Sequence, residues 1–238
     1  MSDFTPDQVT GMKAELVQGF MDKNILRIAA AEEELAPENG PGWFRLKNKS
    51  LSPLFWSIQT LHSYPRLFEL MIILMSEKIN EAGIRYDHIM GVPEGGKCLA
   101  AALGFYRDES IIYMRKEPKD HGQGGLLIGD YKEGDKVLAV EDVITSGGSV
   151  DRDASDKLIQ GTSGQLEVTS AIVGLDRQQK GAGEDPTQNG AAYLASKGIE
   201  LLSVFTQAEA IKYWEPKTDH HKAMKPIIEA YLAKTIVS

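Results

Sequence analysis

The sequence predicts an α/β fold: a mostly parallel central sheet flanked by helices, with a small N-terminal hood. Three observations support this. After residue 83, short apolar runs alternate with segments of helical spacing, which is typical of a parallel sheet covered by helices. The apolar runs do not alternate with polar residues, as expected for strands buried on both faces. The chain has 238 residues, enough for one sizeable α/β domain with an accessory lobe but short for two full domains.

The N-terminal segment predicts a helix and then the hood. Thr5 and Gln8 form a capping-box pattern, and the apolar residues that follow repeat at helical spacing. Residues 29–42 are acidic and alanine-rich and then contain prolines and glycines, so we expect a helix end and an exposed loop, without an assigned function. Residues 43–46 and 54–58 predict two short strands around a polar turn.

The rest of the chain predicts the core. Pro65 opens a helix that Gly83 stops. The expected strands are residues 88–92, 111–115, 137–141, 168–175 and 200–205. The expected helices are residues 97–103, 149–160, 189–196, 208–213 and 224–232. We therefore expect residues 1–60 to form the N-terminal helix and hood subdomain, and residues 61–238 the core domain.

Residues 137–149 combine a buried strand, an acidic pair and a loop of small residues. Glu141 and Asp142 stand where the strand leaves the sheet, and their carboxylates can accept hydrogen bonds from adjacent hydroxyls, as on a ribose. The following loop opens a helical pattern and consists of Thr145, Ser146, Gly147, Gly148 and Ser149. Its backbone N–H groups, hydroxyls and helix N-terminus favour a phosphate. Together these features indicate ribose 5-phosphate.

This run resembles the phosphoribosyl-diphosphate (PRPP) motif of type I phosphoribosyltransferases, and the resemblance implies their fold. It also implies that Glu141 and Asp142 hold the ribose hydroxyls, with Asp142 helping to stabilise a sugar cation, and that residues 145–149 wrap the 5-phosphate. The alternative is a Rossmann-like strand–loop–helix turn without a ligand. The acidic pair at this spacing favours the phosphoribosyl interpretation.

Residues 115–125 concentrate basic charge in an otherwise acidic chain. Pro118 and three glycines disfavour helix and strand, so we expect a mobile loop. A cationic loop can stabilise a departing diphosphate and exclude water when it closes. Taken alone, the segment would more often be a solvated surface loop, as most charged runs are.

The segment closely resembles the catalytic loop of orotate phosphoribosyltransferases. The resemblance implies that Lys116, Lys119 and His121 contact the diphosphate and that Arg115 supports them. It also implies a homodimer in which this loop crosses the interface.

Two further segments resemble the same family. Residues 175–181 match a stretch in which Arg177 would grip the substrate carboxylate with two parallel hydrogen bonds. Residues 44–56 match the hood more loosely; there Lys47 would contact the pyrimidine and Phe55 would flank its ring, although Phe55 could also be ordinary core. Thr145 is also expected at the orotate.

The segment after the first core strand resembles the family's diphosphate-binding loop. It would bind the anion through Glu94, Gly95 and Gly96. Relatives often have a lysine at the position of Gly95, and we do not assume that Lys97 replaces it. Mg²⁺ is the expected cofactor, bound mainly through PRPP and without a dedicated set of protein ligands.

Composition narrows the partners and the location. The net charge of −8 argues against broad nucleic-acid or membrane binding. The single cysteine, Cys98, is expected to be a packing residue and cannot form an internal disulfide, which favours a reducing compartment. The N-terminus lacks the pattern of a signal peptide, so a cytoplasmic location is expected.

The resemblance thus implies an orotate phosphoribosyltransferase, in which orotate N1 attacks C1 of the ribose and diphosphate leaves. Two alternatives stay open. One is a transferase of the same fold that acts on a purine or another base. The other is a regulator that senses PRPP and binds nucleic acid without turnover; the cationic loop and the acidic composition argue against it.

Overall fold

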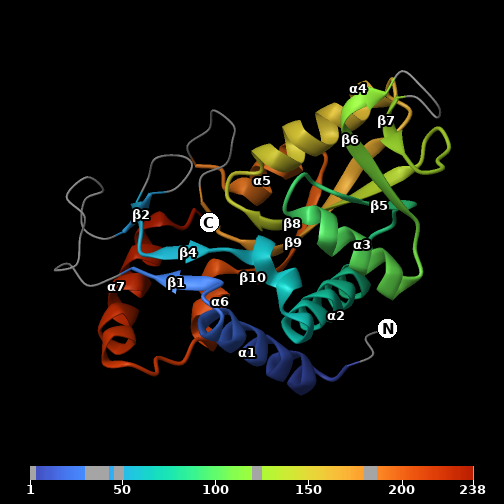
Figure 1. Cartoon of the computed structure of the whole chain (residues 1–238). Coiled ribbons are helices and arrows are strands. Elements are labelled where there is room, and N and C mark those ends of the chain that lie inside the picture. Colours follow the sequence, from blue (N-terminus) through green and yellow to red (C-terminus); the bar gives the residue numbers. More distant parts are fainter. Residues whose placement is uncertain (1–3, 30–42, 46–50, 120–124, 180–186, 238) are drawn as a thin grey trace.

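The computed structural model describes residues 4–29, 43–45, 51–119, 125–179 and 187–237 (Figure 1). At its centre is a six-stranded sheet of order β10-β9-β8-β5-β6-β7. These strands are β5 (His88–Gly91), β6 (Ile111–Lys119), β7 (Gly125–Ile128), β8 (Lys136–Ile144), β9 (Glu167–Asp176) and β10 (Glu200–Thr206). Neighbouring strands are parallel except β6 and β7, which are antiparallel. The predicted mostly parallel sheet is confirmed.

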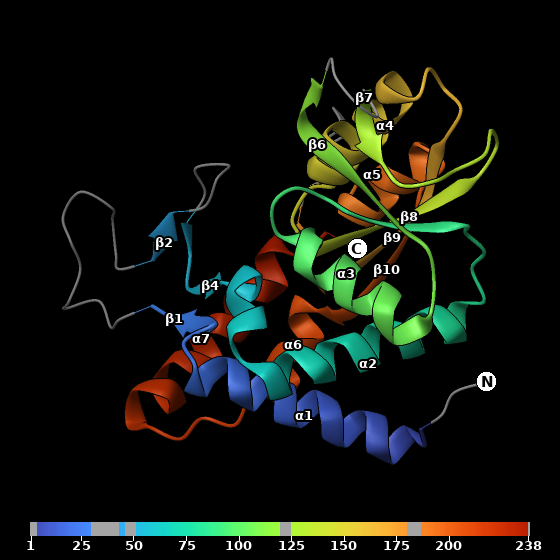
Figure 2. The ribbon, with the colours of Figure 1, turned by 45° about the vertical axis from the view of Figure 1, so that its right-hand side comes forward.

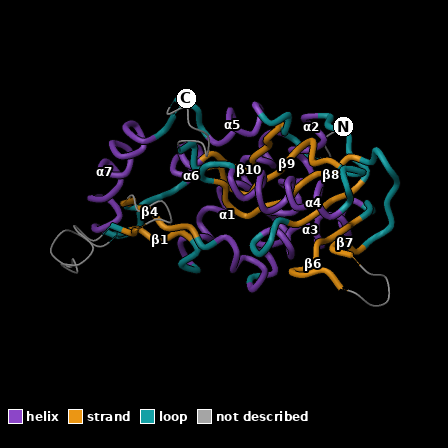
Figure 3. The backbone as a smooth tube through the Cα atoms, turned by 90° about the horizontal axis from the view of Figure 1, so that it is seen from above, coloured by secondary structure: helices purple, strands orange, loops and turns teal. Residues whose placement is uncertain are grey.

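Helices cover both faces of the sheet. On one face, α2 (Pro65–Ala82) and α3 (Gly96–Arg107) pack on the strands, and α1 (Pro6–Asp22) packs on α2 and on α6 (Gln207–Tyr213). The other face is covered by η3 (Ser149–Asp156), α4 (Lys157–Gly161) and α5 (Gly190–Ser196) (Figure 2). The remaining helices are η2 (Ile58–Ser63) and α7 (Asp219–Thr235). Viewed from above, α7 lies at the opposite end of the molecule from β6 and β7 (Figure 3).

Strand β8 divides the core into two clusters, because successive side chains of a strand point to opposite faces. Leu138 and Val140 lie in the cluster with α2 and α3, whereas Val137 and Ala139 lie in the cluster with η3 and α5. All four are fully buried. This explains why the strand reads as an unbroken apolar run.

The hood consists of four short strands: β1 (Leu26–Ile28), β2 (Phe44–Arg45), β3 (Leu51–Ser52) and β4 (Leu54–Trp56). β4 pairs with β1, and β2 pairs with β3, both antiparallel. The sequence predicted two strands and missed β1 and β3, because two or three residues are too few to display a period. Ala29 directly follows β1, so the predicted helix end there is wrong; residues 30–42 lie outside the described residues.

The cationic segment also differs from its prediction. β6 runs through Arg115 to Lys119 and β7 begins at Gly125, and Lys119 pairs with Gly125. The expectation of a loop was therefore wrong at both ends of this segment. A register shift between Met114 and Lys119 accommodates Pro118, which cannot donate to a ladder. Residues 120–124 lie outside the described part of the chain.

The predicted helices of the core are confirmed, with ends that shift by a few residues. Gly83 ends α2 with a left-handed φ of 63°, as predicted. The prediction that Cys98 is a packing residue was wrong, because it lies exposed on α3. Within the described ranges, none of the helices combines the length and the apolar character that crossing a membrane requires.

Candidate active site

The carboxyl ends of the parallel strands gather the predicted site residues at one edge of the sheet. Glu94 to Gly96 follow β5, Thr145 to Ser149 follow β8, and Arg177 follows β9. The Arg177 N–H donates to the carbonyl of Ile144 at 3.0 Å, which fixes the start of one loop beside the start of the other. Ligands of parallel α/β sheets bind beyond this edge.

Glu141 and Asp142 form a close acidic pair at the end of β8. The Asp142 N–H donates to Glu141 Oε1 at 3.1 Å, and the Val143 N–H donates to Asp142 Oδ1 at 2.8 Å. Burial raises the pKa of Glu141 far above its usual range, and the neighbouring Asp142 carboxylate raises it further. Glu141 therefore carries a proton in the free protein, and cations or hydroxyl donors at this edge would favour its ionised form.

The loop after β5 lies directly on β8. A Cβ atom built on Gly96 would stand 1.8 Å from the carbonyl oxygen of Val140. One built on Gly95 would stand 2.4 Å from Asp142 Oδ1. Lys97 lies on α3 and pairs with Glu94 at 3.0 Å, both side chains being exposed. The two glycines thus let the loop after β5 approach the acidic pair closely, so that a diphosphate and a ribose could share one site.

The loop from Thr145 to Ser149 has the geometry of a phosphate cradle. Gly147 has a left-handed φ of 86°, which glycine adopts without strain. Asp151, in the first turn of η3, accepts a hydrogen bond from the Tyr193 hydroxyl of α5. Because this bond joins two buried side chains beneath the loop, the N-terminus of η3 is held in place.

Arg177 is a buried cation whose hydrogen-bond partners in the described part of the chain are neutral. Its side chain is 7% exposed, and it donates from Nε to Gln207 Oε1 at 3.2 Å and from Nη2 to Ser52 Oγ at 3.3 Å. Burial lowers the pKa of Arg177, which the charge of Tyr231 partly opposes. Among the described residues, no Asp or Glu forms an ion pair with it. A buried, unbalanced guanidinium favours an anionic ligand.

The hood places Phe55 and Trp56 on opposite sides of β4. Trp56 is buried and meets Phe20 edge to face, with ring centroids 6.3 Å apart. Phe55 is half-buried, and the centroid of its ring lies 4.5 Å from the guanidinium carbon of Arg27. Trp56 is therefore ordinary core, whereas Phe55 is partly exposed.

Several predicted site residues cannot be placed. Lys47 and His121 lie outside the described residues, and for Lys116 and Lys119 only the strand of the backbone is described. Their predicted contacts with the pyrimidine and the diphosphate stay predictions.

Two residues of this edge were missed by the sequence analysis. Gln207 contacts Arg177 directly, and the guanidinium of Arg152 lies beside Gly148, where a built Cβ would be 2.6 Å from Nη2. Gln207 could have been predicted as a site residue from its position just after β10, because that strand ends at the same edge of the sheet.

The oxygen ligands at this edge fit Mg²⁺ held mainly by a substrate. Glu141 and Asp142 supply hard carboxylate oxygens, the kind that Mg²⁺ prefers. Across the described ranges, no group of three or more His, Cys, Asp or Glu side chains could hold a metal ion. Two carboxylates fit an ion that keeps most of its ligands from phosphate and water.

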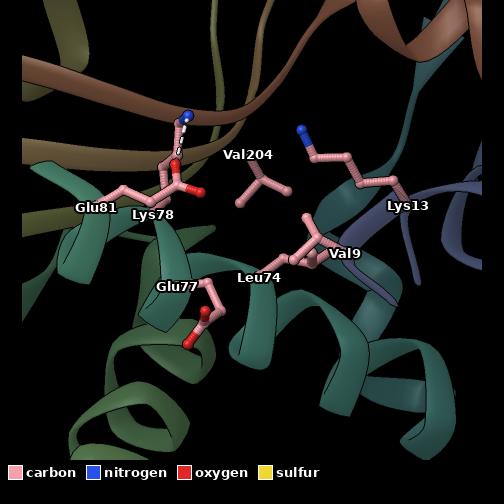
Figure 4. Close-up of a pocket in the computed structure, with 7 residues that line it drawn as sticks. All are labelled: Val9, Lys13, Leu74, Glu77, Lys78, Glu81 and Val204. Atoms are coloured by element: carbon pink, nitrogen blue, oxygen red, sulfur yellow. Dashed lines mark hydrogen bonds and ion pairs between the residues drawn. The ribbon is translucent and has the colours of Figure 1, made fainter. Parts of the chain in front are cut away.

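A separate surface hollow lies away from this edge, between α1, α2 and β10 (Figure 4). Figure 4 shows the Lys78 ammonium directed at Glu81, and the two groups form an ion pair at 3.1 Å. None of the predicted site residues lines this hollow. It is therefore not part of the candidate site.

The close contact of Gly96 with β8 predicts that one added methyl group strongly destabilises the folded protein. Gly96→Ala should lower the free energy of unfolding by more than about 2 kcal/mol, because backbone atoms must shift to remove the overlap. Gly11→Ala is the matched control: it lies in α1 with nothing within 4 Å of the added carbon, and should stabilise by about 0.5–1 kcal/mol. Urea denaturation measures both; equal stabilities would contradict the prediction.

The raised pKa of Glu141 predicts that replacing it with the neutral Gln stabilises the folded protein by an amount that depends on pH. The pKa of Glu141 is higher in the folded than in the unfolded protein. Its contribution to the free energy of unfolding is therefore favourable at low pH and is lost as the pH rises from about 4.5 toward the folded pKa. Glu141→Gln lacks this loss and should be more stable than the parent at pH 8, by on the order of 1–3 kcal/mol, but not at pH 4.5.

Thermal melts across this pH range provide the measurement. Glu167→Gln, an exposed position on neighbouring β9, is the control and should change little. A gain for Glu141→Gln that did not depend on pH would refute the assigned protonation.

The chain resembles known proteins over most of its length. It is 32% identical over 193 residues to orotate phosphoribosyltransferase of Caenorhabditis elegans, covering 81% of this chain and 79% of that protein. It is 33% identical over 168 residues to orotate phosphoribosyltransferase of Pyrococcus furiosus, covering 71% of this chain and 83% of that protein.

No family model matches the chain. The fold agrees with the crystal structure of orotate phosphoribosyltransferase from Francisella tularensis, with a TM-score of 0.69 at 20% identity, over 93% of this chain and 99% of that one. A sequence identity above 30% across more than two thirds of a relative establishes kinship, and the protein belongs to the orotate phosphoribosyltransferase family.

Proposed function

We propose that the protein transfers the 5-phosphoribosyl group of PRPP to N1 of orotate, giving orotidine 5-monophosphate and diphosphate. This is a step of de novo pyrimidine biosynthesis. The observation that carries the proposal is the buried Arg177, which has neutral hydrogen-bond partners among the described residues and lies beside the loop from Thr145 to Ser149. The orotate carboxylate supplies the anion that this guanidinium needs.

The edge of the sheet supports binding of PRPP in one orientation. The 5-phosphate fits the loop from Thr145 to Ser149, where Arg152 adds positive charge beside Gly148. The ribose hydroxyls fit the carboxyl groups of Glu141 and Asp142. The diphosphate fits the backbone of Glu94 to Gly96, which lies against Asp142. Each part of the substrate thus meets a group of suitable charge.

The reaction exchanges one bond for another at C1 of the ribose. The C1–O bond to diphosphate breaks with its electron pair on the leaving oxygen, and orotate N1 forms the new bond. The protein positions both substrates and stabilises charge, with no covalent intermediate. Asp142 would stabilise the positive charge that develops on the sugar. Arg177, Thr145, Lys47 and Phe55 would hold orotate opposite the leaving group.

The leaving diphosphate requires positive charge. By kinship, Arg115, Lys116, Lys119 and His121 would supply it from the end of β6 and from the segment that joins β6 to β7. Charge on the departing oxygens grows as the bond breaks, so cations there lower the barrier more than they strengthen binding. Mg²⁺ bound through PRPP would neutralise further negative charge, near the oxygens of Glu141 and Asp142.

An exposed apolar surface supports a homodimer. We define this surface by Phe105 and Tyr106 of α3 and by Ile111 and Tyr113 of β6, which are 88%, 47%, 39% and 48% exposed. Several large apolar side chains exposed on neighbouring elements are typical of protein interfaces. The surface includes the start of the strand that leads to Lys119, which supports a loop shared between subunits.

The lone Cys98 supports a cytoplasmic location.

One assay tests the proposed function. Diphosphate release is measured with PRPP, Mg²⁺ and, in turn, orotate, uracil, adenine, hypoxanthine and guanine. We expect release with orotate. Release with a purine alone would identify a different transferase of this fold, and nucleic-acid binding at physiological salt without turnover would identify a regulator.

Two substitutions separate the roles of the cationic segment and of Arg177. Lys119→Ala should lower kcat by about 100-fold or more with a smaller effect on the KM for orotate, because the lost contact strengthens in the transition state. Arg177→Ala should mainly raise the KM for orotate. Steady-state kinetics provide both readouts, and slight, equal effects of the two changes would count against these roles.

Mixing the two variants tests the shared loop. Activity is measured at an orotate concentration far below the KM of Arg177→Ala, where each variant alone is nearly inactive. If Lys119 serves the neighbouring subunit, a mixture of Lys119→Ala and Arg177→Ala chains forms heterodimers with one intact site, and activity should recover to about a quarter of the parent value. Phe105→Glu should prevent this recovery and give a monomer by light scattering. A dimeric Phe105→Glu protein would rule out the apolar surface as the interface.

A further inference from the structure

Gln207 occupies a buried position between the hood and Arg177. It is the first residue of α6 and is fully buried. Its Oε1 accepts two hydrogen bonds, from Trp56 Nε1 at 3.0 Å and from Arg177 Nε at 3.2 Å. A single side-chain oxygen therefore connects a core residue of β4 to the guanidinium.

The orientation of this amide is determined by its neighbours. Indole Nε1 and guanidinium Nε are donors only, so the group that faces both of them must be the carbonyl oxygen. The amide nitrogen, Nε2, then points elsewhere, and it is buried without a hydrogen-bond partner in the structure. An unpartnered buried donor beside an unbalanced cation favours a nearby acceptor.

These contacts decide which part of the guanidinium is available. Gln207 occupies Nε, and Ser52 Oγ takes one hydrogen of Nη2. A carboxylate can be gripped side-on through Nε and one terminal nitrogen, or end-on through the two terminal nitrogens. With Nε occupied, the end-on pair stays available for a ligand.

We propose that Gln207 is a positioning residue for the pyrimidine carboxylate: it holds Arg177 in the orientation that presents its two terminal nitrogens to that group. This inference rests on the proposed function and extends it, because it names what orients the arginine. Gln207 acts through Arg177, which it contacts at Nε.

The test compares two product nucleotides that differ in the carboxylate. Orotidine 5-monophosphate carries it and uridine 5-monophosphate does not, so the ratio of their Kd values reports on carboxylate recognition alone. Isothermal titration calorimetry measures both. In Gln207→Leu, Kd for orotidine 5-monophosphate should rise about tenfold or more, because a hydrogen bond to a charged group is lost, while Kd for uridine 5-monophosphate should change less than about twofold.

Two more variants complete the design. Gln207→Glu keeps the acceptor oxygen but places a competing carboxylate on Arg177, so it should also selectively weaken the binding of orotidine 5-monophosphate. This variant provides the test if Gln207→Leu does not fold. Trp56→Phe removes the other donor to Gln207 and should leave the ratio of the two Kd values within about twofold of the parent's.

Three outcomes are distinguishable. Selective loss of orotidine 5-monophosphate binding in the Gln207 variants supports the proposal. Equal loss of both nucleotides, or no loss, overturns it and leaves Gln207 as a core residue. A parent protein that binds both nucleotides equally and releases no diphosphate with orotate contradicts the proposed function itself.

Discussion

The parallel register of β5, β8, β9 and β10 is the constraint on which the site depends. Because these strands point the same way, their carboxyl ends meet at one edge, and the segments that follow each of them become neighbours. Ile144 pairs with Asp176, so the phosphate loop and Arg177 start at the same level. Glycines after β5 then allow a third segment to reach the backbone of β8.

The edge assembled in this way is electrostatically incomplete. A buried guanidinium lies among neutral partners, and a buried glutamate retains its proton next to another carboxylate. Both arrangements cost stability in the free protein, since charge in a poorly solvated place needs compensation. The proposed substrates supply that compensation: a carboxylate for Arg177, and hydroxyls with a divalent cation for the acidic pair. Stability of the free protein and affinity for substrates are therefore opposed at this edge.

The hood joins the site through polar contacts. Ser52 reaches Arg177 directly, and Trp56 reaches it through Gln207. Any displacement of β3 or β4 would therefore disturb the guanidinium. The core continues beneath these contacts, since Trp56 packs on Phe20 of α1. In the proposed function, recognition of the base would therefore depend on residues from the first quarter of the chain, on Arg177 just after β9 and on Gln207 of α6.

Local patterns in the sequence were enough to predict the sheet, its flanking helices, and an acidic pair followed by a loop of small residues. The run from Val137 to Val140 is apolar because both faces of β8 are covered, and Gly147 marks the left-handed turn of the loop. Only the tertiary structure decided the pairing of the hood strands, the continuation of β6 to Lys119 and the exposure of Cys98. It alone brought Gln207 to Arg177. Residues 30 positions apart in sequence meet because two parallel strands end side by side, and no local pattern records that contact.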